Sequence, residues 1–240
     1  MLYTDIHTHM LFATDDGPSR AEDAYQMVDM AYADGTRRIC LTPHTASRMF
    51  GRSTESALSA YEALQKYAGD RYPDLSLSMA NELHYSADWK ERVKSGECHL
   101  IGGRYLLFDL PSDVTFFTLR YAVEEILATG QPAILAHAER YGALVGEYDA
   151  LRDFCRRGLL IQLNASAFAP DVSFKKRRHV KQIVRRCSIA AVASDAHGVA
   201  FRPPILSAAE EVISARYGAD AAALWLDRSP RLLWEGKLPY

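Results

Sequence analysis

The sequence predicts an α/β fold in which seven parallel strands, each followed by a helix, form a barrel within a single domain over residues 1–240. Short segments rich in Ile, Leu, Val and Tyr alternate with longer amphipathic ones, as buried strands alternate with surface helices. Seven such pairs follow one another without an obvious break, which favours a closed barrel over an open sheet. A regular eight-stranded barrel usually needs about 250 residues. Seven strands therefore suit this chain of 240 residues.

The bounds of each predicted element come from the same alternation. The apolar segments predicted to be strands are residues 2–9, 38–42, 75–81, 105–110, 132–137, 159–164 and 189–194. The amphipathic segments predicted to be helices are residues 19–33, 53–68, 87–95, 117–129, 147–157, 175–186 and 205–216. Because Ser19 precedes Glu22 by three residues, the first helix is expected to begin with a capping box.

Composition excludes several classes of protein. The chain is 48% hydrophobic and 24% charged, which is typical of a soluble globular protein. Its net charge of -2 gives no reason to expect nucleic acid or an anionic membrane as a partner. It has no signal-peptide pattern and no apolar run long enough to span a bilayer, and its four cysteines are scattered. A cytoplasmic protein that is not embedded in a membrane is therefore expected.

Ionisable side chains recur where the predicted strands end. Nine residues of this kind are His7, His9, Asp16, His44, Glu82, Asp109, His137, Asp195 and His197. Six of the seven strands deliver a His, Asp or Glu at or near their ends, and the C-terminal ends of barrel strands meet at one rim. Any one of these residues alone is better explained as a cap or a loop residue. The set predicts a cluster.

The types of these nine residues indicate metal chemistry. His7 and His9 are two apart on a strand, so their side chains point to the same side. Imidazole and carboxylate ligands without cysteine suit Mn, Fe, Co or Zn at a catalytic site. Nine donors exceed what one ion can use. Two or three divalent ions with bridging carboxylates are therefore expected, as in two-metal phosphatases.

Two arginines follow predicted ligands. Arg140 comes three residues after His137, and Arg202 comes five residues after His197. A guanidinium matches the geometry of phosphate oxygens and offsets their charge. Each arginine could instead form a surface salt bridge, for instance Arg140 with Glu139. Their position on two ligand-bearing loops favours a role in binding phosphate.

With these residues in view, the chain resembles the PHP (polymerase and histidinol phosphatase) superfamily. Within it, the chain is similar to the bacterial capsule-type, manganese-dependent tyrosine-protein phosphatases. The segments that carry the resemblance are residues 5–10 (DIHTHM), 15–19 (DDGPS), 42–44 (TPH), 81–83 (NEL), 105–111 (YLLFDLP), 137–141 (HAERY), 162–168 (QLNASAF), 194–204 (SDAHGVAFRPP) and 229–238 (SPRLLWEGKL). They cover nearly the whole chain in the family's order.

The resemblance implies a distorted seven-stranded, TIM-like barrel, the PHP fold, and a trinuclear site, most simply of Mn²⁺. It implies one metal held by His7, His9, Glu82 and Asp195; a second held by Glu82, Asp109 and His137; a third held by Asp16, His44 and His197; and phosphate bound by Arg140 and Arg202. It also implies a phosphotyrosine protein as substrate, namely a bacterial tyrosine kinase that controls polysaccharide export. The chain departs from the family at Asp109, where a Glu is usual, and at Ala138, where a Pro is usual.

Two other functions stay open at this point. A small-molecule phosphatase, such as a histidinol-phosphate phosphatase, would share the metal ligands. A binding or regulatory module with a degenerate site is the alternative from another class, although nine intact donors argue against it.

Some features are open to a second interpretation. Cys98 and Arg104 have the C-x5-R spacing of cysteine-dependent tyrosine phosphatases. The segment enters a strand instead of leaving one, so we interpret it as a turn. The basic residues 175–178 are interpreted as a solvated helix face that could attract an acidic or phosphorylated peptide.

Several histidines and aromatic residues are left outside the predicted metal cluster. His84, His99 and His179 are interpreted as structural or exposed, with a rim position open to His84; Phe12, Phe50 and Tyr141 could line a pocket for an aromatic ring or pack in the core.

Overall fold

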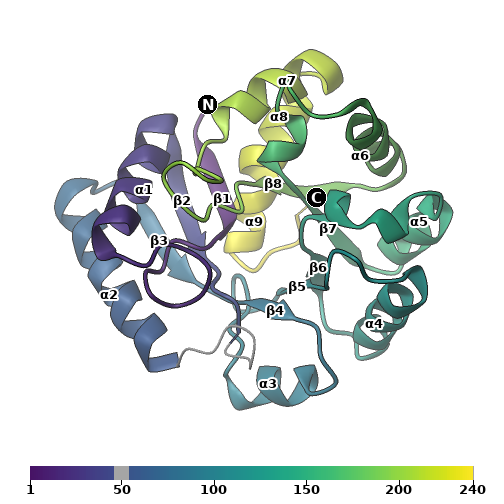
Figure 1. The fold of residues 1–240 in the computed structure, drawn as a ribbon, viewed down its shortest axis with the longest axis horizontal. Helices are drawn as coiled ribbons and strands as arrows, with labels where there is room; N and C mark the ends of the chain where they lie inside the picture. The colour runs from purple at the N-terminus through teal and green to yellow at the C-terminus, as the bar shows by residue number, and fades with distance from the viewer. Residues whose placement is uncertain (46–53, 240) are drawn as a thin grey trace.

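Parallel strands lie at the centre of the molecule and helices surround them (Figure 1). The structure is a computed structural model that describes residues 1–45 and 54–239. The strands are β1 (Tyr3–Thr8), β2 (Thr36–Leu41), β3 (Ser76–Met79), β4 (Glu82–His84), β5 (Leu106–Asp109), β6 (Ala133–Leu135), β7 (Leu159–Asn164) and β8 (Ile189–Ala193). They form one sheet in the order β1-β2-β3 and a second in the order β4-β5-β6-β7-β8.

The helices connect successive strands, as the alternation of segments predicts. They are α1 (Ala21–Asp34), α2 (Thr54–Arg71), α3 (Trp89–Ser95), α4 (Phe116–Ala128), α5 (Tyr148–Arg156), α6 (Phe174–Arg186), α7 (Ser207–Tyr217), α8 (Ala219–Ala223) and α9 (Ser229–Trp234). Shorter turns are η1 (Ala138–Arg140), η2 (Gly142–Leu144), η3 (Ala165–Phe168) and the π-helical η4 (Leu224–Arg228). No described helix is long and apolar enough to cross a membrane.

The predicted α/β class and the parallel strand order are confirmed, whereas a closed barrel of seven strands is not confirmed. The described residues form eight strands, because the segment predicted as one strand over residues 75–81 leads into two. At the break, the Asn81 side chain donates to the Pro43 carbonyl at 3.1 Å and accepts from the His99 amide at 2.8 Å. Since Asn81 bonds to loop backbone instead of continuing the ladder, Glu82 begins β4 and does not close β3.

Two seams connect the sheets. At the first seam, Thr8 pairs with Ala196, and the Asp195 amide donates to the His7 carbonyl at 2.9 Å. At the second seam, His44 pairs with Glu82. His7, Asp195, His44 and Glu82 therefore lie where the two sheets meet, and the backbone pairing itself brings these distant residues together.

The buried apolar side chains form three clusters. Met27 and Ile39 belong to the cluster between the three-stranded sheet and its helices, and Phe108 and Ile183 belong to the cluster outside the five-stranded sheet. A third cluster, which includes Ile6, draws on both sheets. Burying one such side chain contributes about 1.5–3 kcal/mol, so these clusters hold the strands rigidly enough to position a site.

The ends of two elements differ from the sequence prediction. Helix α1 begins at Ala21 with Arg20 as N-cap and no capping side chain, so the predicted capping box from Ser19 is wrong. The Pro18 carbonyl accepts from the Ala13 amide at 2.8 Å, which keeps this segment in the preceding loop.

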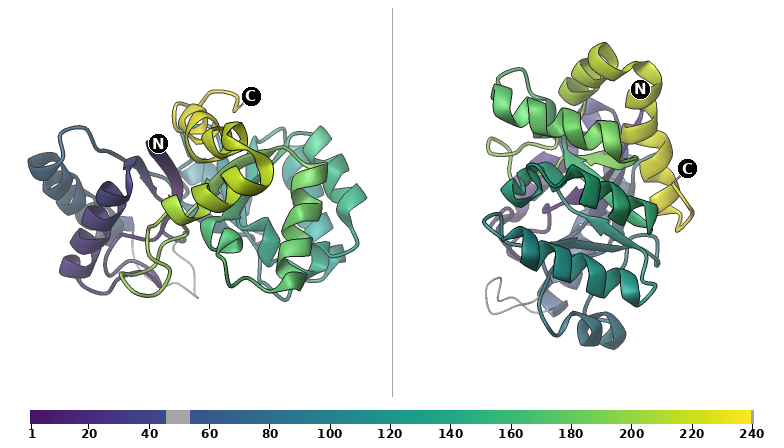
Figure 2. Two further views of the ribbon diagram at one scale, coloured as in Figure 1. Left: turned by 90° about the horizontal axis from the view of Figure 1, so that it is seen from above. Right: turned by 90° about the vertical axis from the view of Figure 1, so that its right-hand side faces the viewer.

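After α7, the structure adds α8, η4 and α9, which the sequence analysis does not predict. Helix α9 contacts β1 and β8, and Figure 2 shows it on the side where β1 begins.

Candidate metal centre

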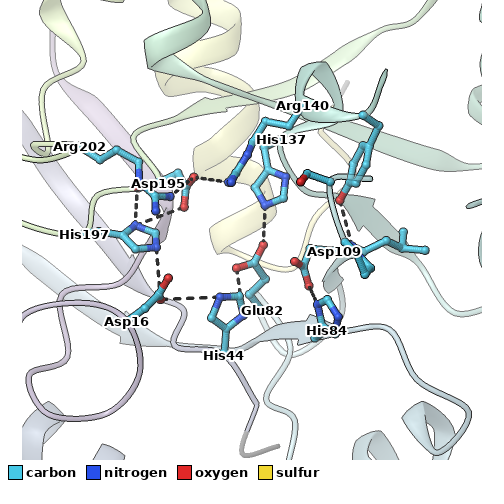
Figure 3. Close-up of a pocket in the computed structure, with 14 residues that line it drawn as sticks. Asp16, His44, Glu82, His84, Asp109, His137, Arg140, Asp195, His197 and Arg202 are labelled. Atoms are coloured by element: carbon cyan, nitrogen blue, oxygen red, sulfur yellow. Dashed lines mark hydrogen bonds and ion pairs between the residues drawn. The ribbon is translucent and has the colours of Figure 1, made fainter. Parts of the chain in front are cut away.

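The predicted donors gather around one cavity of about 160 Å³ (Figure 3). Seven of the nine line it: Asp16, His44, Glu82, Asp109, His137, Asp195 and His197. The other two, His7 and His9, are fully buried and contact Glu82 and Asp195 behind the lining. The structure therefore brings together all nine residues that the sequence analysis selects.

The tightest group of donor atoms is at the first seam. The Nε2 atoms of His7 and His9 lie 3.1 Å apart, and Glu82 Oε2 lies 3.3 Å from the first and 3.1 Å from the second. Asp195 Oδ1 lies 3.5 Å and 3.6 Å from the same two nitrogens. Ligand atoms bound at about 2.1 Å are separated by about 3.0 Å in an octahedral site and about 3.4 Å in a tetrahedral one. The donor atoms of His7, His9 and Asp195 all lie within 4.8 Å of one another, a spacing that fits a single divalent cation, and Glu82 Oε2 faces both histidines.

Hydrogen bonds orient both histidines toward this point. His9 Nδ1 lies 2.7 Å from Asp15 Oδ2, and His7 Nδ1 lies 3.2 Å from Gln162 Oε1. A histidine that donates from Nδ1 keeps its Nε2 lone pair for a metal, and such outer partners fix both the ring orientation and the tautomer. Asp15 and Gln162 are therefore positioning residues for the two imidazoles.

A second group of donors surrounds Asp16. Asp16 Oδ1 lies 3.4 Å from His197 Nε2 and 3.8 Å from His44 Nε2. His9, Asp16 and His44 each offer a donor atom within 4.8 Å of the others. His197 Nδ1 donates to the Asp195 carbonyl at 2.8 Å, which directs its Nε2 to Asp16. Since the Asp16 side chain is 45% exposed, this group is the most open to solvent.

A third group lies at the second seam. His44, Glu82 and Asp109 place donor atoms within 4.8 Å of one another. Glu82 Oε1 lies 2.9 Å from His137 Nε2, while its Oε2 faces the first group. Both oxygens of Glu82 are thus directed at donor groups, as a bridging carboxylate requires. Asp109, the shorter residue, lies 3.0 Å from His84 Nδ1.

The two predicted arginines reach one oxygen of Asp195 from two loops. Arg202 donates to Asp195 Oδ2 over 3.0 Å and Arg140 over 3.3 Å. Asn164 donates to the same oxygen at 2.7 Å. Both guanidinium groups also line the cavity, so each can present further N–H donors to an anion inside it.

The backbone is strained at the site. Positive φ angles occur at His137 (34°), Asp195 (51°) and Arg202 (49°), which are three of the four described non-glycine residues with such angles. This conformation costs about 1–3 kcal/mol per residue and tends to persist at functional sites. The fold therefore keeps these side chains in place at an energetic cost.

The electrostatics of the site are dominated by its carboxylates. Burial opposes ionisation of Asp195, but positive charge on His7 and His9 outweighs it and brings the pKa of Asp195 to about 2. Burial also opposes protonation of His9, yet the charge of Asp15 raises the pKa of His9 well above its ordinary value. Asp195 thus stays ionised and attracts positive charge, which a bound cation would supply in place of protons.

The sequence analysis missed the residues that orient the ligands. Asp15 stands beside a predicted ligand, and Gln162 and Asn164 lie on β7, the strand without an ionisable end. Gln162 Oε1 accepts from the His137 amide at 2.6 Å, and its Nε2 donates to Asn164 Oδ1 at 2.9 Å. Two alternating amide side chains in an otherwise apolar strand could have identified them. Buried amides need hydrogen-bond partners, so such a pair indicates a polar contact inside the fold.

The C-x5-R segment is structural, as its sequence order indicates. Cys98 is buried, and burial raises the pKa of its thiol to about 12, which leaves it unreactive. The residues between it and Arg104 form a turn in which Gly102 has a φ of 58°. A Cβ on Gly102 would lie 2.3 Å from the Leu233 carbonyl oxygen, so glycine is required there by close packing.

The remaining candidates divide between cavity and core. Tyr141 and His84 line the cavity, and Phe12 packs instead against a buried apolar cluster. His179 contacts Tyr148, and the His99 backbone bonds to Asn81. Phe50 lies outside the described residues.

Fold and site together define an α/β protein with a His, Asp and Glu centre that fits divalent cations. The family model for capsular polysaccharide synthesis, CpsB/CapC, matches residues 3–233, and the chain belongs to this family. The tyrosine-protein phosphatase CpsB of Streptococcus pneumoniae is 27% identical over 239 residues, covering 96% of this chain and 98% of that protein. The putative tyrosine-protein phosphatase CapC of Staphylococcus aureus is 28% identical, covering 84% of this chain and 80% of that protein.

A solved structure has a similar fold. It is one of the crystal structures of YwqE from Bacillus subtilis and CpsB from Streptococcus pneumoniae, which are described as metal-dependent tyrosine phosphatases. It superposes with a TM-score of 0.88 at 21% sequence identity, covering 99% of this chain and 96% of that one. The likeness shows that the two chains share a fold.

Proposed function

We propose that this protein is a metal-dependent phosphomonoesterase that removes phosphate from phosphotyrosine in a protein. The observation that carries the proposal is the convergence of nine His, Asp and Glu donors and two arginines on one small cavity. The names of its relatives, which are tyrosine-protein phosphatases, support the choice of substrate.

We propose that the nine donors hold three divalent ions, each Mn²⁺. The resemblance supplies the proposed ligands: His7, His9, Glu82 and Asp195 for one ion, Glu82, Asp109 and His137 for a second, and Asp16, His44 and His197 for a third. Bound divalent ions would supply a nucleophilic water at neutral pH and would neutralise charge on phosphoryl oxygens.

The arginines would bind the phosphoryl group. Arg140 and Arg202 share Asp195 Oδ2, which fixes each guanidinium beside the cavity before substrate arrives. Donors held in place in this way stabilise the charge that spreads over the phosphoryl oxygens in the transition state, without a cost for reorganisation. The strained backbone at Arg202 is consistent with this positioning.

The cavity wall suits an aromatic leaving group. Leu110, Pro111 and Tyr141 line the cavity beside the donors. The Tyr141 hydroxyl accepts from the Leu110 amide at 3.0 Å, so the Tyr141 ring is held in place. Of these side chains, Pro111 is exposed, so it is the one that an aromatic ring in the cavity could pack against.

The surface around the cavity favours a protein over a small molecule as substrate. Phe117, Val145, Phe174 and Phe201 are 79%, 61%, 74% and 70% exposed. All four lie in segments that follow β5, β6, β7 and β8, at the strand ends where the site is. Exposed apolar side chains at this end of the fold would be available for contact with a protein substrate.

Finer points of the proposal rest on the resemblance. We propose that the phosphoprotein is a bacterial tyrosine kinase acting in polysaccharide synthesis, in keeping with the family description. We also propose that residues 1–240 act as one domain and that the two sheets together form the distorted PHP barrel. A cytoplasmic location stays a prediction from the sequence.

Removal of metal tests the core of the proposal. The chelated protein should lose hydrolysis of a phosphotyrosyl peptide by at least about a hundredfold, and Mn²⁺ should restore it. Full activity after chelation would show that the donor cluster is not the catalytic centre. Faster turnover of histidinol phosphate than of the peptide would favour the small-molecule alternative.

A further inference from the structure

A groove of about 600 Å³ lies between α5 and α6, outside the metal centre. Its lining includes Val145, Tyr148, Lys175, Arg178, Gln182 and Arg186. Helices α5 and α6 are side by side in Figures 1 and 2. We call this feature the α5–α6 groove.

The groove is strongly basic on its α6 side. Seven of the 13 residues of α6 are Lys or Arg and none is Asp or Glu, in a chain with a net charge of -2. Among the described residues, no carboxylate lies within salt-bridge distance of Lys175 or Arg178, which are both exposed. These two charges are therefore available to an acidic ligand.

The floor of the groove holds a buried polar group. His179 is only 7% exposed and its Nδ1 lies 2.9 Å from the Tyr148 hydroxyl. Its Nε2 is buried and has no hydrogen-bond partner among the described residues. The Arg186 guanidinium lies over the Tyr148 ring, 5.3 Å from the centroid. The α5–α6 groove therefore combines cations with a buried imidazole that lacks one partner.

The groove is linked to the cavity of the metal centre through η1. Helix α6 contacts η1, the turn that carries Arg140. Val145, which lines the groove, follows Arg140 by five residues in the same connection. A peptide with its phosphotyrosine in the cavity can therefore extend over η1 and η2 toward α6.

We propose that the α5–α6 groove binds an acidic segment of the phosphoprotein, next to its phosphotyrosine. This inference rests on the proposed function and adds a preference for acidic residues near the target tyrosine. Charge complementarity supports this proposal. Lys175 and Arg178 form no salt bridge among the described residues, so both charges can pair with an acidic ligand. A recessed groove beside a catalytic pocket suits an extended peptide better than a duplex or a membrane, which would need a broad basic surface.

Charge reversal in the groove tests this proposal. The double variant Lys175→Glu with Arg178→Glu is compared with the wild type on two phosphotyrosyl peptides, one flanked by Glu and one by Gln at the same positions. We expect kcat/KM for the Glu-flanked peptide to fall about five- to tenfold, mainly through KM. Hydrolysis of the Gln-flanked peptide and of p-nitrophenyl phosphate should stay within about twofold of the wild type, because the metal centre is untouched.

A charge-matched control separates local from overall electrostatics. Lys66→Glu with Lys94→Glu changes the net charge equally, through two exposed lysines on α2 and α3. This control should hydrolyse both peptides like the wild type. Equal losses in both double variants, or equal losses on both peptides, would overturn the proposal.

A binding measurement keeps the inference distinct from the proposed function. The unphosphorylated Glu-flanked peptide carries a fluorophore, and its anisotropy is followed with each variant at low and high salt. Binding weakened by salt and by the groove variant supports the α5–α6 groove even if no phosphotyrosine were hydrolysed. Wild-type binding that is tighter to duplex DNA or to anionic vesicles than to the peptide would overturn the choice of partner.

Discussion

Asp15 Oδ2 lies 2.7 Å from His9 Nδ1, and the two side chains are both buried. The same oxygen accepts from the His44 amide at 3.0 Å. One carboxylate therefore orients one predicted ligand and fixes the backbone of another. The neighbouring Asp16 has its nearest contact with His197, at 3.4 Å, and lies 3.8 Å from His9 Nδ1, so two adjacent acids in the sequence have different tasks.

Replacing Asp15 should weaken metal binding without removing a ligand. Asp15→Ala leaves all nine donors in place but frees the His9 ring to rotate and to change tautomer. We expect metal affinity to fall about 10- to 100-fold, as measured by calorimetric titration of the metal-free protein. Asp70→Ala, which removes an exposed acid on α2, should bind metal like the wild type. Unchanged affinity in Asp15→Ala would mean that packing alone holds His9.

Gly17 should be required by the loop that carries both acids. A Cβ on Gly17 would lie 2.0 Å from the His9 carbonyl oxygen, so the loop must move in Gly17→Ala. We expect the free energy of unfolding to fall by about 1–3 kcal/mol, with weaker metal binding as Asp16 shifts. Thermal and urea unfolding measure the first effect.

Gly69→Ala is the matched control for this change, since nothing lies within 4 Å of its added Cβ on α2. It should stabilise the protein by about 0.5–1 kcal/mol because alanine favours a helix. A similar loss in both variants would contradict a specific role for Gly17.

The arginines should act on phosphate more than on metal. Arg202→Ala removes a donor beside Asp195 and should lower kcat/KM on a phosphotyrosyl peptide by about a hundredfold, with metal content unchanged. Arg202→Lys keeps the positive charge but not the paired N–H donors of a guanidinium. It should therefore recover only part of the lost kcat/KM. Arg140→Ala should behave in the same way. Steady-state kinetics measure kcat/KM, and elemental analysis measures the metal content of each variant. A loss of bound metal in either variant would contradict a role in binding phosphate alone.

Asp109 should control the occupancy of one metal site. Asp109→Ala removes a carboxylate from the proposed second site, which Asp109 shares with Glu82 and His137. We expect about one metal ion fewer per chain by elemental analysis, while Asp109→Glu, which restores the residue usual in the family, should keep the wild-type number. Loss of an ion in the Glu variant as well would indicate that the contact with His84 sets the required side-chain length.

Metal should stabilise the folded state. Ions that bind the native site and not the unfolded chain add about 2.7 kcal/mol at a hundredfold excess over the dissociation constant. The Tm should therefore rise with added Mn²⁺ and fall with a chelator. Glu82→Gln, which weakens the bridging carboxylate, should reduce this metal-dependent shift. If neither Mn²⁺ nor a chelator changed the Tm, the result would argue against a metal site that exists only in the folded protein.

The class of fold, and the nine residues that the structure brings together around the cavity, could be predicted from the order of residues alone. Strand and helix segments are visible because burial on parallel strands gives continuous apolar runs, and ligands stand out because His, Asp and Glu end run after run. His7, Glu82 and Asp195 could thus be selected although they are far apart in the chain.

The division of the strands and the residues that support the ligands depend on contacts between distant segments. The break at Asn81 depends on its bonds to Pro43 and His99, partners that local sequence does not reveal. Asp15 and Gln162 became positioning residues through contacts with His9 and His7 that form only when the loop and β7 meet β1. Periodicity reports how much of a segment is buried, whereas a hydrogen bond between distant segments depends on where the fold places both partners.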